Sequence, residues 1–111
     1  MSLLVWNYRR LGNLCTGKEL GELVRAKGPS VVFIAETWAD EVRLKQIKKD
    51  IHFDSLFFVP RVHGGGGLAM LWKKSINLSV ESFSKNHIDS TIDKGSNEAW
   101  RFTGFYEEPD A

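Results

Sequence analysis

Val31-Val32-Phe33-Ile34-Ala35-Glu36 is the stretch around which the rest of the chain is arranged. Its first five residues are apolar without interruption, and Pro29 and Ser30 precede them. A continuous apolar run of this kind is typical of a strand that is covered on both faces. It ends in the carboxylate of Glu36, and a charge at the end of a buried strand needs solvent, a partner or a metal ion. Because ligands of open α/β sheets bind beyond the carboxyl ends of strands, Glu36 is the first candidate functional residue, with a merely solvated carboxylate as the alternative.

A second apolar strand is expected over residues 3–6, and it ends at the polar Asn7. Between the two strands, Thr16-Gly17-Lys18-Glu19 matches a capping box and predicts a helix over residues 16–27. A strand–helix–strand unit with this spacing predicts a right-handed crossover between parallel strands. Since parallel strands end at the same edge of a sheet, we expect Asn7 and Glu36 at one edge.

The remaining chain continues as one further helix and a series of strands. Asp40 is expected to cap a helix over residues 41–51. The glycine-rich stretch 61–67 lacks the Lys-Ser/Thr pair of a phosphate-binding loop and precedes a strand, so it is expected to be a flexible loop. Apolar runs and alternating patterns predict strands over residues 53–59, 68–72, 76–80, 87–93 and 100–106.

Length and composition restrict the classes of function. The 111 residues are a common size for one domain, and the net charge of +1 does not indicate a strong field toward nucleic acid or membrane, although a local basic groove stays open. The single Cys15 excludes an internal disulfide and fits a reducing, intracellular compartment such as the nucleus or cytoplasm. We expect neither a transmembrane helix nor a signal peptide, because no apolar span is long enough.

Other polar side chains support two readings each. Asn7 can orient a phosphate or a metal-bound water, or simply form a turn. Tyr106 can donate its phenol to a phosphate oxygen, or lie half-buried in the core. The histidines are isolated and complete no metal-ligand spacing; they are His52, His63 and His87. Four basic residues are expected near the same rim, as phosphate contacts or as solvated charges: Arg9, Arg10, Arg61 and Lys73.

The end of the chain is unusual for a complete domain. A strand rich in Trp, Phe and Tyr is followed only by five residues, Glu107 to Ala111. We expect an unpartnered sheet edge or face there, with Trp100 and Phe102 packing on a part of the fold that this chain does not contain. The chain is therefore interpreted as the front part of a larger fold.

Four stretches together resemble a known family. They are Trp6-Asn7-Tyr8-Arg9-Arg10-Leu11-Gly12-Asn13, Phe33-Ile34-Ala35-Glu36-Thr37, Gly65-Gly66-Gly67-Leu68-Ala69-Met70-Leu71-Trp72-Lys73 and Trp100-Arg101-Phe102-Thr103-Gly104-Phe105-Tyr106. In this order and spacing they resemble motifs of the endonuclease/exonuclease/phosphatase superfamily. The closest form is the endonuclease domain of plant LINE-type (non-LTR) retrotransposon proteins, and the resemblance covers nearly the whole chain.

The resemblance implies an α/β fold that is part of a four-layer sandwich, with two facing β-sheets and outer helices. It also implies cleavage of phosphodiester bonds in DNA, with contacts to the phosphate backbone and with Mg²⁺, or Mn²⁺ as the alternative, as cofactor. Asn7 matches the active-site Asn of the family, Glu36 its metal ligand, and Tyr106 the residue that helps to bind the scissile phosphate. Asn7 and Glu36 are therefore the expected metal site, and all three residues are the expected catalytic set.

The sequence also departs from the family pattern. Tyr8 stands where Cys is usual, Arg10 where Gly is usual, and Glu107 replaces a Gly. The later Asp-x-Asn and Asp-His motifs, which supply the general base and its orienter, are absent. Residues 1–111 are thus interpreted as the N-terminal portion of such a domain, inactive on its own. Two alternatives stay open: a non-catalytic nucleic-acid-binding or interaction module, and a phosphatase of the same superfamily.

Overall fold

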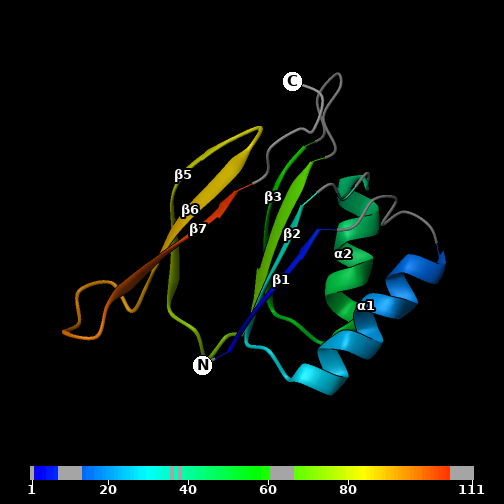
Figure 1. Ribbon diagram of the computed structural model, residues 1–111, viewed down its shortest axis with the longest axis horizontal. Helices are drawn as coiled ribbons and strands as arrows, with labels where there is room; N and C mark the ends of the chain where they lie inside the picture. Colours follow the sequence, from blue (N-terminus) through cyan, green and yellow to red (C-terminus); the bar gives the residue numbers. More distant parts are fainter. Residues whose placement is uncertain (1, 8–13, 36, 38, 61–66, 106–111) are drawn as a thin grey trace.

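The computed structural model describes residues 2–7, 14–35, 37, 39–60 and 67–105. This part of the chain forms two β-sheets and two helices, in the order β1-α1-β2-α2-β3-β4-β5-β6-β7 (Figure 1). Neither helix of this part is long and apolar enough to cross a membrane. The expected α/β class with two facing sheets is confirmed.

The first sheet has the strand order β1-β2-β4-β3. β1 (Leu3–Asn7) pairs with β2 (Val31–Ala35) in parallel, whereas β4 (Leu68–Trp72) runs antiparallel to both β2 and β3 (Ser55–Val59). All five residues of β2 are buried, as the continuous apolar run predicts for a strand covered on both faces. The expected parallel pairing of the first two strands is confirmed.

Two helices cover one face of this sheet: α1 (Leu14–Lys27) and α2 (Glu41–Asp50). Leu20 and Val24 of α1, and Leu44 and Ile47 of α2, pack with inward residues of the sheet in one buried cluster. The expected cap of α2 is present, because Asp40 Oδ1 accepts a hydrogen bond from the backbone N–H of Arg43 at 2.8 Å. This layer fixes the crossover that makes β1 and β2 parallel.

Three elements have clearly different bounds from those expected: α1 and β3, and also β5, which covers Leu78–Ser84 and not residues 76–80. α1 begins at Leu14, so Thr16 lies inside its first turn and is not the N-cap of a helix beginning there. The third strand begins at Ser55 and not at Phe53, because the backbone N–H of Phe53 donates to the carbonyl of Lys48 at 3.0 Å and still belongs to the end of α2. Phe53 is buried, and its apolar side chain is the reason why the predicted strand began two residues too early.

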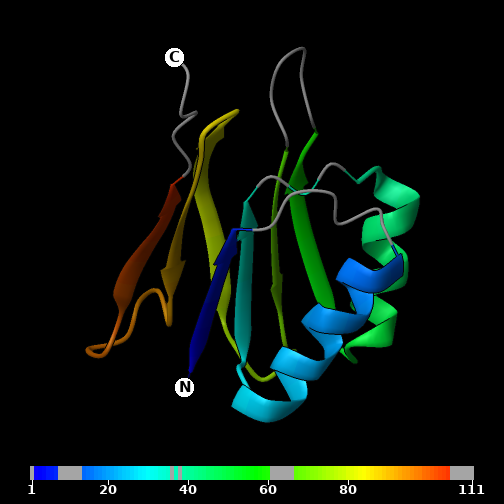
Figure 2. The same ribbon diagram turned by 45° about the vertical axis from the view of Figure 1, so that its right-hand side comes forward.

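The second sheet packs on the other face of the first (Figure 2). It consists of β5 (Leu78–Ser84), β6 (His87–Ile92) and β7 (Trp100–Phe105), all antiparallel. Edge-to-face ring pairs join the sheets: Phe33 with Phe102 at 6.0 Å, and Phe57 with Phe83 at 5.2 Å between centroids. The described residues thus form three layers, helices on sheet on sheet, and the fourth layer that the resemblance implies is not among them.

One packing expectation was wrong. Phe102 was expected to pack on a part of the fold outside this chain, but it packs against the cluster between the two sheets. The sequence could not show this, since only the sheet-on-sheet arrangement brings β7 to β2. Trp100, at the other end of the same strand face, keeps 38% of its surface exposed.

Candidate functional site

The candidate site is the sheet edge at which β1 and β2 end. In their parallel register Asn7 lies beside Ala35, and the same edge receives the start of β4, because Ala35 pairs with Leu68. β7 ends toward this edge as well, so the carboxyl ends of three strands face the same side of the molecule (Figure 1). The strand ends that carry or precede the predicted residues therefore lie on the same side of the molecule.

The side chains of the three predicted residues lie outside the part of the chain that the structure describes. The backbone of Asn7 belongs to β1, but its side chain is not among those described. Glu36 follows Ala35 and Tyr106 follows Phe105 in the sequence, and both lie outside the described residues. The convergence of Asn7, Glu36 and Tyr106 on one ion and one phosphate stays a prediction.

The residues on either side of Glu36 are firmly held. Ala35 is 3% exposed at the end of β2, and Thr37 is 1% exposed. The N–H of Thr37 donates to the carbonyl of Gly67 at 3.2 Å, just before β4. Thr37 Oγ1 in turn accepts from the N–H of Ala39 at 3.4 Å. Ala35 and Thr37 are thus held against the neighbouring strand.

Lys73 contradicts the expectation of a basic rim. It follows Trp72, whose partner Val31 is the first residue of β2, so Lys73 lies at the opposite edge from Ala35. Its N–H donates to the carbonyl of Ser30 at 3.1 Å, and its Nζ lies 5.3 Å from the centre of the Phe53 ring. The apolar run of β4 does not reveal its direction, which is why sequence reasoning placed Lys73 wrongly. Arg9, Arg10 and Arg61 lie outside the described residues.

The metal-binding capacity of the described residues is limited. Among them, no group of three or more His, Cys, Asp or Glu side chains lies close enough to hold a metal ion. The candidates at the sheet edge are an amide oxygen and a carboxylate, Asn7 and Glu36. Such hard oxygen ligands suit Mg²⁺, which keeps several water ligands when few protein groups bind it. The chemistry of these two candidate ligands therefore fits Mg²⁺, and they would leave most of its coordination positions to water.

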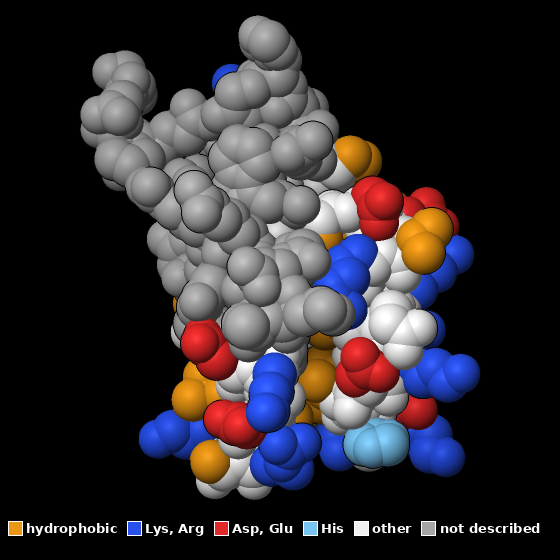
Figure 3. Space-filling view, turned by 90° about the vertical axis from the view of Figure 1, so that its right-hand side faces the viewer, with side chains coloured by type: hydrophobic (Ala, Val, Ile, Leu, Met, Phe, Trp, Pro, Cys, Tyr) orange, Lys and Arg blue, Asp and Glu red, His pale blue; other side chains and the backbone are white. Residues whose placement is uncertain are grey.

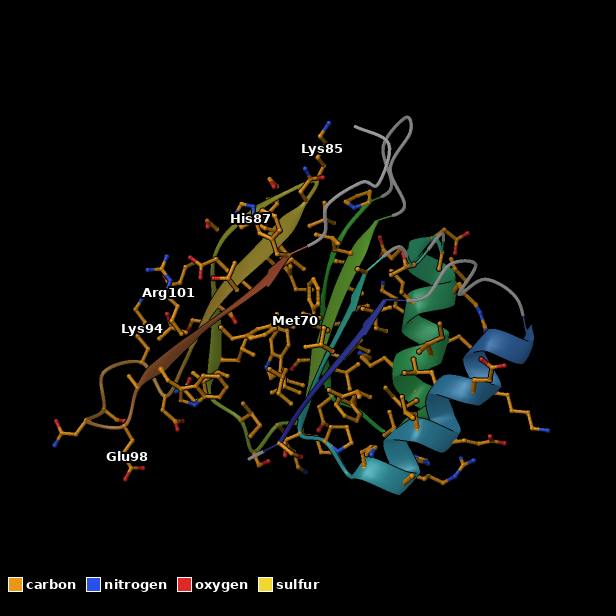
Figure 4. The ribbon with its side chains drawn as sticks, viewed as in Figure 1. Met70, Lys85, His87, Lys94, Glu98 and Arg101 are labelled. Carbon is orange, nitrogen blue, oxygen red and sulfur yellow. The ribbon has the colours of Figure 1, made fainter. Side chains whose placement is uncertain are left out.

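A polar cluster that the sequence analysis did not identify lies on the outer face of the second sheet. Asp89 of β6 is only 4% exposed, and its carboxylate accepts from Arg101 Nε at 2.8 Å and from Thr103 Oγ1 at 3.1 Å. Arg101 Nη2 also pairs with Asp89. Hydrogen bonds from Arg101, and then from Thr103, lower the pKa of Asp89 to about 2. Figure 4 shows Arg101 on the side of the sheet that faces away from Met70, which lies between the sheets.

His87 belongs to the same outer face (Figure 4). Its Nδ1 lies 2.6 Å from Ser84 Oγ across the turn between β5 and β6, and its Nε2 lies 3.4 Å from Ser82 Oγ. It is a half-buried strand residue with hydroxyl partners. The signal that could have revealed this cluster is the alternation of polar residues in β6 and β7, with opposite charges at Asp89 and Arg101.

Among the described residues, charge on the helical side does not form a single basic patch. In the coloured part of Figure 3, Lys and Arg side chains are interspersed with Asp and Glu. Lys45 and Glu41 of α2, for example, pair at 2.7 Å. Mixed charges of this kind are typical of a solvated surface. The sheet edge therefore remains the best candidate for chemistry.

Comparisons with known proteins identify the fold. No protein-family model matches the sequence, and no curated protein matches it either. The endonuclease domain of TRAS1, a telomere-specific non-LTR retrotransposon, has a similar structure, with a TM-score of 0.64 and 16% identity over 98% of this chain and 46% of that one. The AP endonuclease LMAP from Leishmania major gives a TM-score of 0.61 and 14% identity over 94% of this chain and 39% of that one. The chain has the endonuclease/exonuclease/phosphatase fold of these structures and spans less than half of each.

Proposed function

We propose that this chain is the N-terminal part of a metal-dependent DNA endonuclease domain of the retroelement type. The observation that carries the proposal is the parallel register of β1 and β2, which places Asn7 beside Ala35, the residue before Glu36. Two polar residues at adjacent strand ends are the arrangement that open α/β sheets use for ligands. The likeness to two endonuclease structures supports a nuclease, and the motif resemblance favours the plant LINE branch.

In the proposed site, each residue has a separate task. The carboxylate of Glu36 and the side-chain oxygen of Asn7 would hold Mg²⁺. When bound, the ion supplies charge stabilisation to the phosphoryl oxygen during hydrolysis. The phenol of Tyr106 would donate a hydrogen bond to a phosphate oxygen of the DNA backbone. The anchored Ala35 and Thr37 on either side of Glu36 would limit the movement of the metal ligand.

The proposed chemistry is incomplete in this chain alone. Nothing in the sequence matches the motifs that supply the general base, and general acid–base catalysis contributes roughly 10²–10⁴-fold to rate. Both similar structures are more than twice as long as the part that this chain matches. We therefore propose that a complementary C-terminal half is a partner, in the nucleus or cytoplasm, and that the isolated chain does not cleave DNA.

Nicking of supercoiled plasmid DNA tests the proposal. The unmatched part of the TRAS1 endonuclease domain is fused behind this chain, and the fusion is assayed with Mg²⁺ and with Mn²⁺. The fusion should nick the plasmid, the isolated chain should not, and Glu36→Ala should abolish nicking. Glu41→Ala, a change of the same type in the exposed first turn of α2, serves as control and should leave nicking unchanged.

Two results would count against the proposal. Nicking by the isolated chain that Glu36→Ala abolishes would show that a base is already present in residues 1–111. Tight binding of DNA without metal, in a folded fusion that never cleaves, would favour the non-catalytic binding module.

A further inference from the structure

β3 is a sheet edge without charge, proline or bulge. It pairs with β4 on one side, and the described residues provide no strand on its other side. Natural sheet edges are commonly protected by charged residues, by proline or by a bulge. The strand Ser55–Val59 contains neither a charged residue nor a proline, and its register with β4 is regular. The nearby edge strand β5, by contrast, is bulged between Val80 and Ser82. Of these two edges, β3 is therefore the one open to a further strand.

Two hydrogen bonds assign the backbone groups of β4 that face β3. The N–H of Lys73 donates to the carbonyl of Ser30 at 3.1 Å, so this N–H points toward β2. Because successive residues of a strand direct their backbone groups to opposite sides, Trp72 directs its own groups toward β3. In agreement, the carbonyl of Trp72 accepts from the N–H of Asp54 at 3.3 Å. Met70, two residues before Trp72, faces β3 in the same way.

The outward backbone groups of β3 are therefore those of Leu56 and Phe58. Phe57 pairs with Met70, so its N–H and C=O point toward β4, and the groups of its two neighbours point away from the sheet. Two copies of the strand can satisfy all of these groups in antiparallel pairing, with Leu56 of each copy opposite Phe58 of the other. This register places the two Phe57 residues opposite each other at its centre.

Charge and exposure favour a second copy of this chain as the partner. The same register places Asp54 of one copy opposite Pro60 of the other, so no like charges face each other. The ring of Phe57 lies 5.2 Å from that of Phe83 in β5, and Phe83 is 58% exposed. A two-fold axis perpendicular to the first sheet keeps both second sheets on the same side. The ring pairs of the two copies would then meet and cover each other.

We infer that two copies of the chain associate through antiparallel pairing of their β3 edges. The two first sheets then form one continuous sheet, and the rings of Phe57 and Phe83 from both copies form an apolar contact on its inner side. The paired strands are short, so the interface is small and the dimer is weak and dependent on concentration. The inference does not rest on the proposed function.

Amide hydrogen exchange, measured by NMR on the full chain at low and high protein concentration, tests the pairing. The amides of Leu56 and Phe58 should slow by about tenfold or more at the high concentration, since they gain hydrogen-bond partners only in the dimer. The amides of Phe57 and Val59 already face β4 and should change much less. Sedimentation equilibrium of the same samples should show monomers and dimers.

Charge variants of Phe83 locate the ring contact. Phe83→Lys and Phe83→Glu should each shift the equilibrium toward the monomer, because like charges would face each other across the two-fold axis. An equal mixture of the two variants should recover the dimer, since opposite charges then meet. Phe105→Lys is the matched control, at a phenylalanine of β7 that is 68% exposed, and it should leave the association unchanged.

Four results would overturn the inference. The chain could remain monomeric at NMR concentrations, or the dimers could persist in both single Phe83 variants. The amides that slow with concentration could belong to β1 or β7 and not to Leu56 and Phe58. Finally, protection of Leu56 and Phe58 that is independent of concentration, in the fusion with the unmatched part of the TRAS1 domain, would assign this edge to the complementary half. None of these measurements depends on nicking, so this inference and the proposed nuclease activity can fail separately.

Discussion

Gly104 of β7 lies directly against the ring of Phe33 in β2. A Cβ atom at Gly104 would collide with three atoms of that ring, so the ring occupies the space that a side chain at this position would need. Phe33 is 1% exposed and shares the core between the sheets with Met70 and Ile88. The glycine is thus a packing requirement of the sandwich, on the strand that ends at the candidate site.

Gly104→Ala should therefore destabilise the fold by about 1–3 kcal/mol, the usual effect of overpacking a core. Urea denaturation measures the change, and Phe33→Leu in the same chain should recover part of it by making space. Gly21→Ala is the matched control, because its Cβ would meet only Arg25 Nη1 at an ordinary 3.7 Å within α1. It should stabilise the chain by about 0.5–1 kcal/mol through helix propensity. Equal effects of the two substitutions would contradict the observed sheet packing.

The Asp89 cluster should make stability depend on pH in the acid range. Hydrogen bonds from Arg101 and Thr103 lower the folded-state pKa of Asp89 to about 2, whereas an unfolded Asp has a pKa of about 3.9. The unfolded state therefore takes up the proton first. The stabilising contribution is complete above about pH 5 and is lost as the pH falls toward 2.

Asp89→Asn should flatten this acid dependence of the free energy of unfolding, as measured by urea titrations between about pH 2 and pH 6. Asp50→Asn, at an exposed position at the end of α2, is a control outside the cluster and should retain the slope of the parent chain. A parent-like slope in Asp89→Asn would mean that the acid sensitivity arises from other groups.

The N-cap of α2 gives a third prediction. Asp40→Ala removes the carboxylate oxygen that accepts the Arg43 N–H at 2.8 Å, so one N-terminal donor of the helix loses its partner. The expected loss is about 0.5–2 kcal/mol of stability, measured by thermal or urea unfolding. Asp40→Asn retains an acceptor and should lose much less. A similar loss in both variants would point to the charge and not to the cap.

Much of the fold could be predicted from the sequence because apolar runs indicate buried strands directly. The run from Val31 to Ala35, the strand before Asn7 and the helix between them predicted the parallel pairing, because a helical crossover of this length usually joins parallel strands. Local signals also identified the Asp40 cap. These features depend on residues that are near one another in the chain.

The wrong predictions for Lys73 and Phe102 depended on long-range geometry. The direction of β4 decides on which edge Lys73 lies, and an apolar strand looks the same in both directions. Two contacts depend on where β7 lies in the fold. Phe102 packs on Phe33 only when β7 lies against the first sheet, and Asp89 pairs with Arg101 only when β7 lies beside β6. At the candidate site, the sequence identified the strand ends, but only a resemblance assigned roles to Asn7, Glu36 and Tyr106.

Mg²⁺ binding is the most direct test of the sheet edge. We expect weak, millimolar binding by the isolated chain, because one carboxylate leaves most of the ion's water ligands in place. Calorimetric titration should show that Glu36→Gln, which keeps the size and removes the charge, abolishes the binding. NMR should show the largest Mg²⁺-dependent shifts at Ala35 and Thr37, whose backbone is held on either side of Glu36.

The matched control is Glu41→Gln, which removes an exposed carboxylate whose direct surface ion pair with Lys45 contributes little to stability. It should leave both the affinity and the shifts unchanged. Tight binding that persists in Glu36→Gln, or shifts centred on Asp89 on the outer face of the second sheet, would place the metal elsewhere. Because Asn7 lies beside Ala35, a site at this edge also requires that Asn7→Ala weakens the binding without moving the shifts.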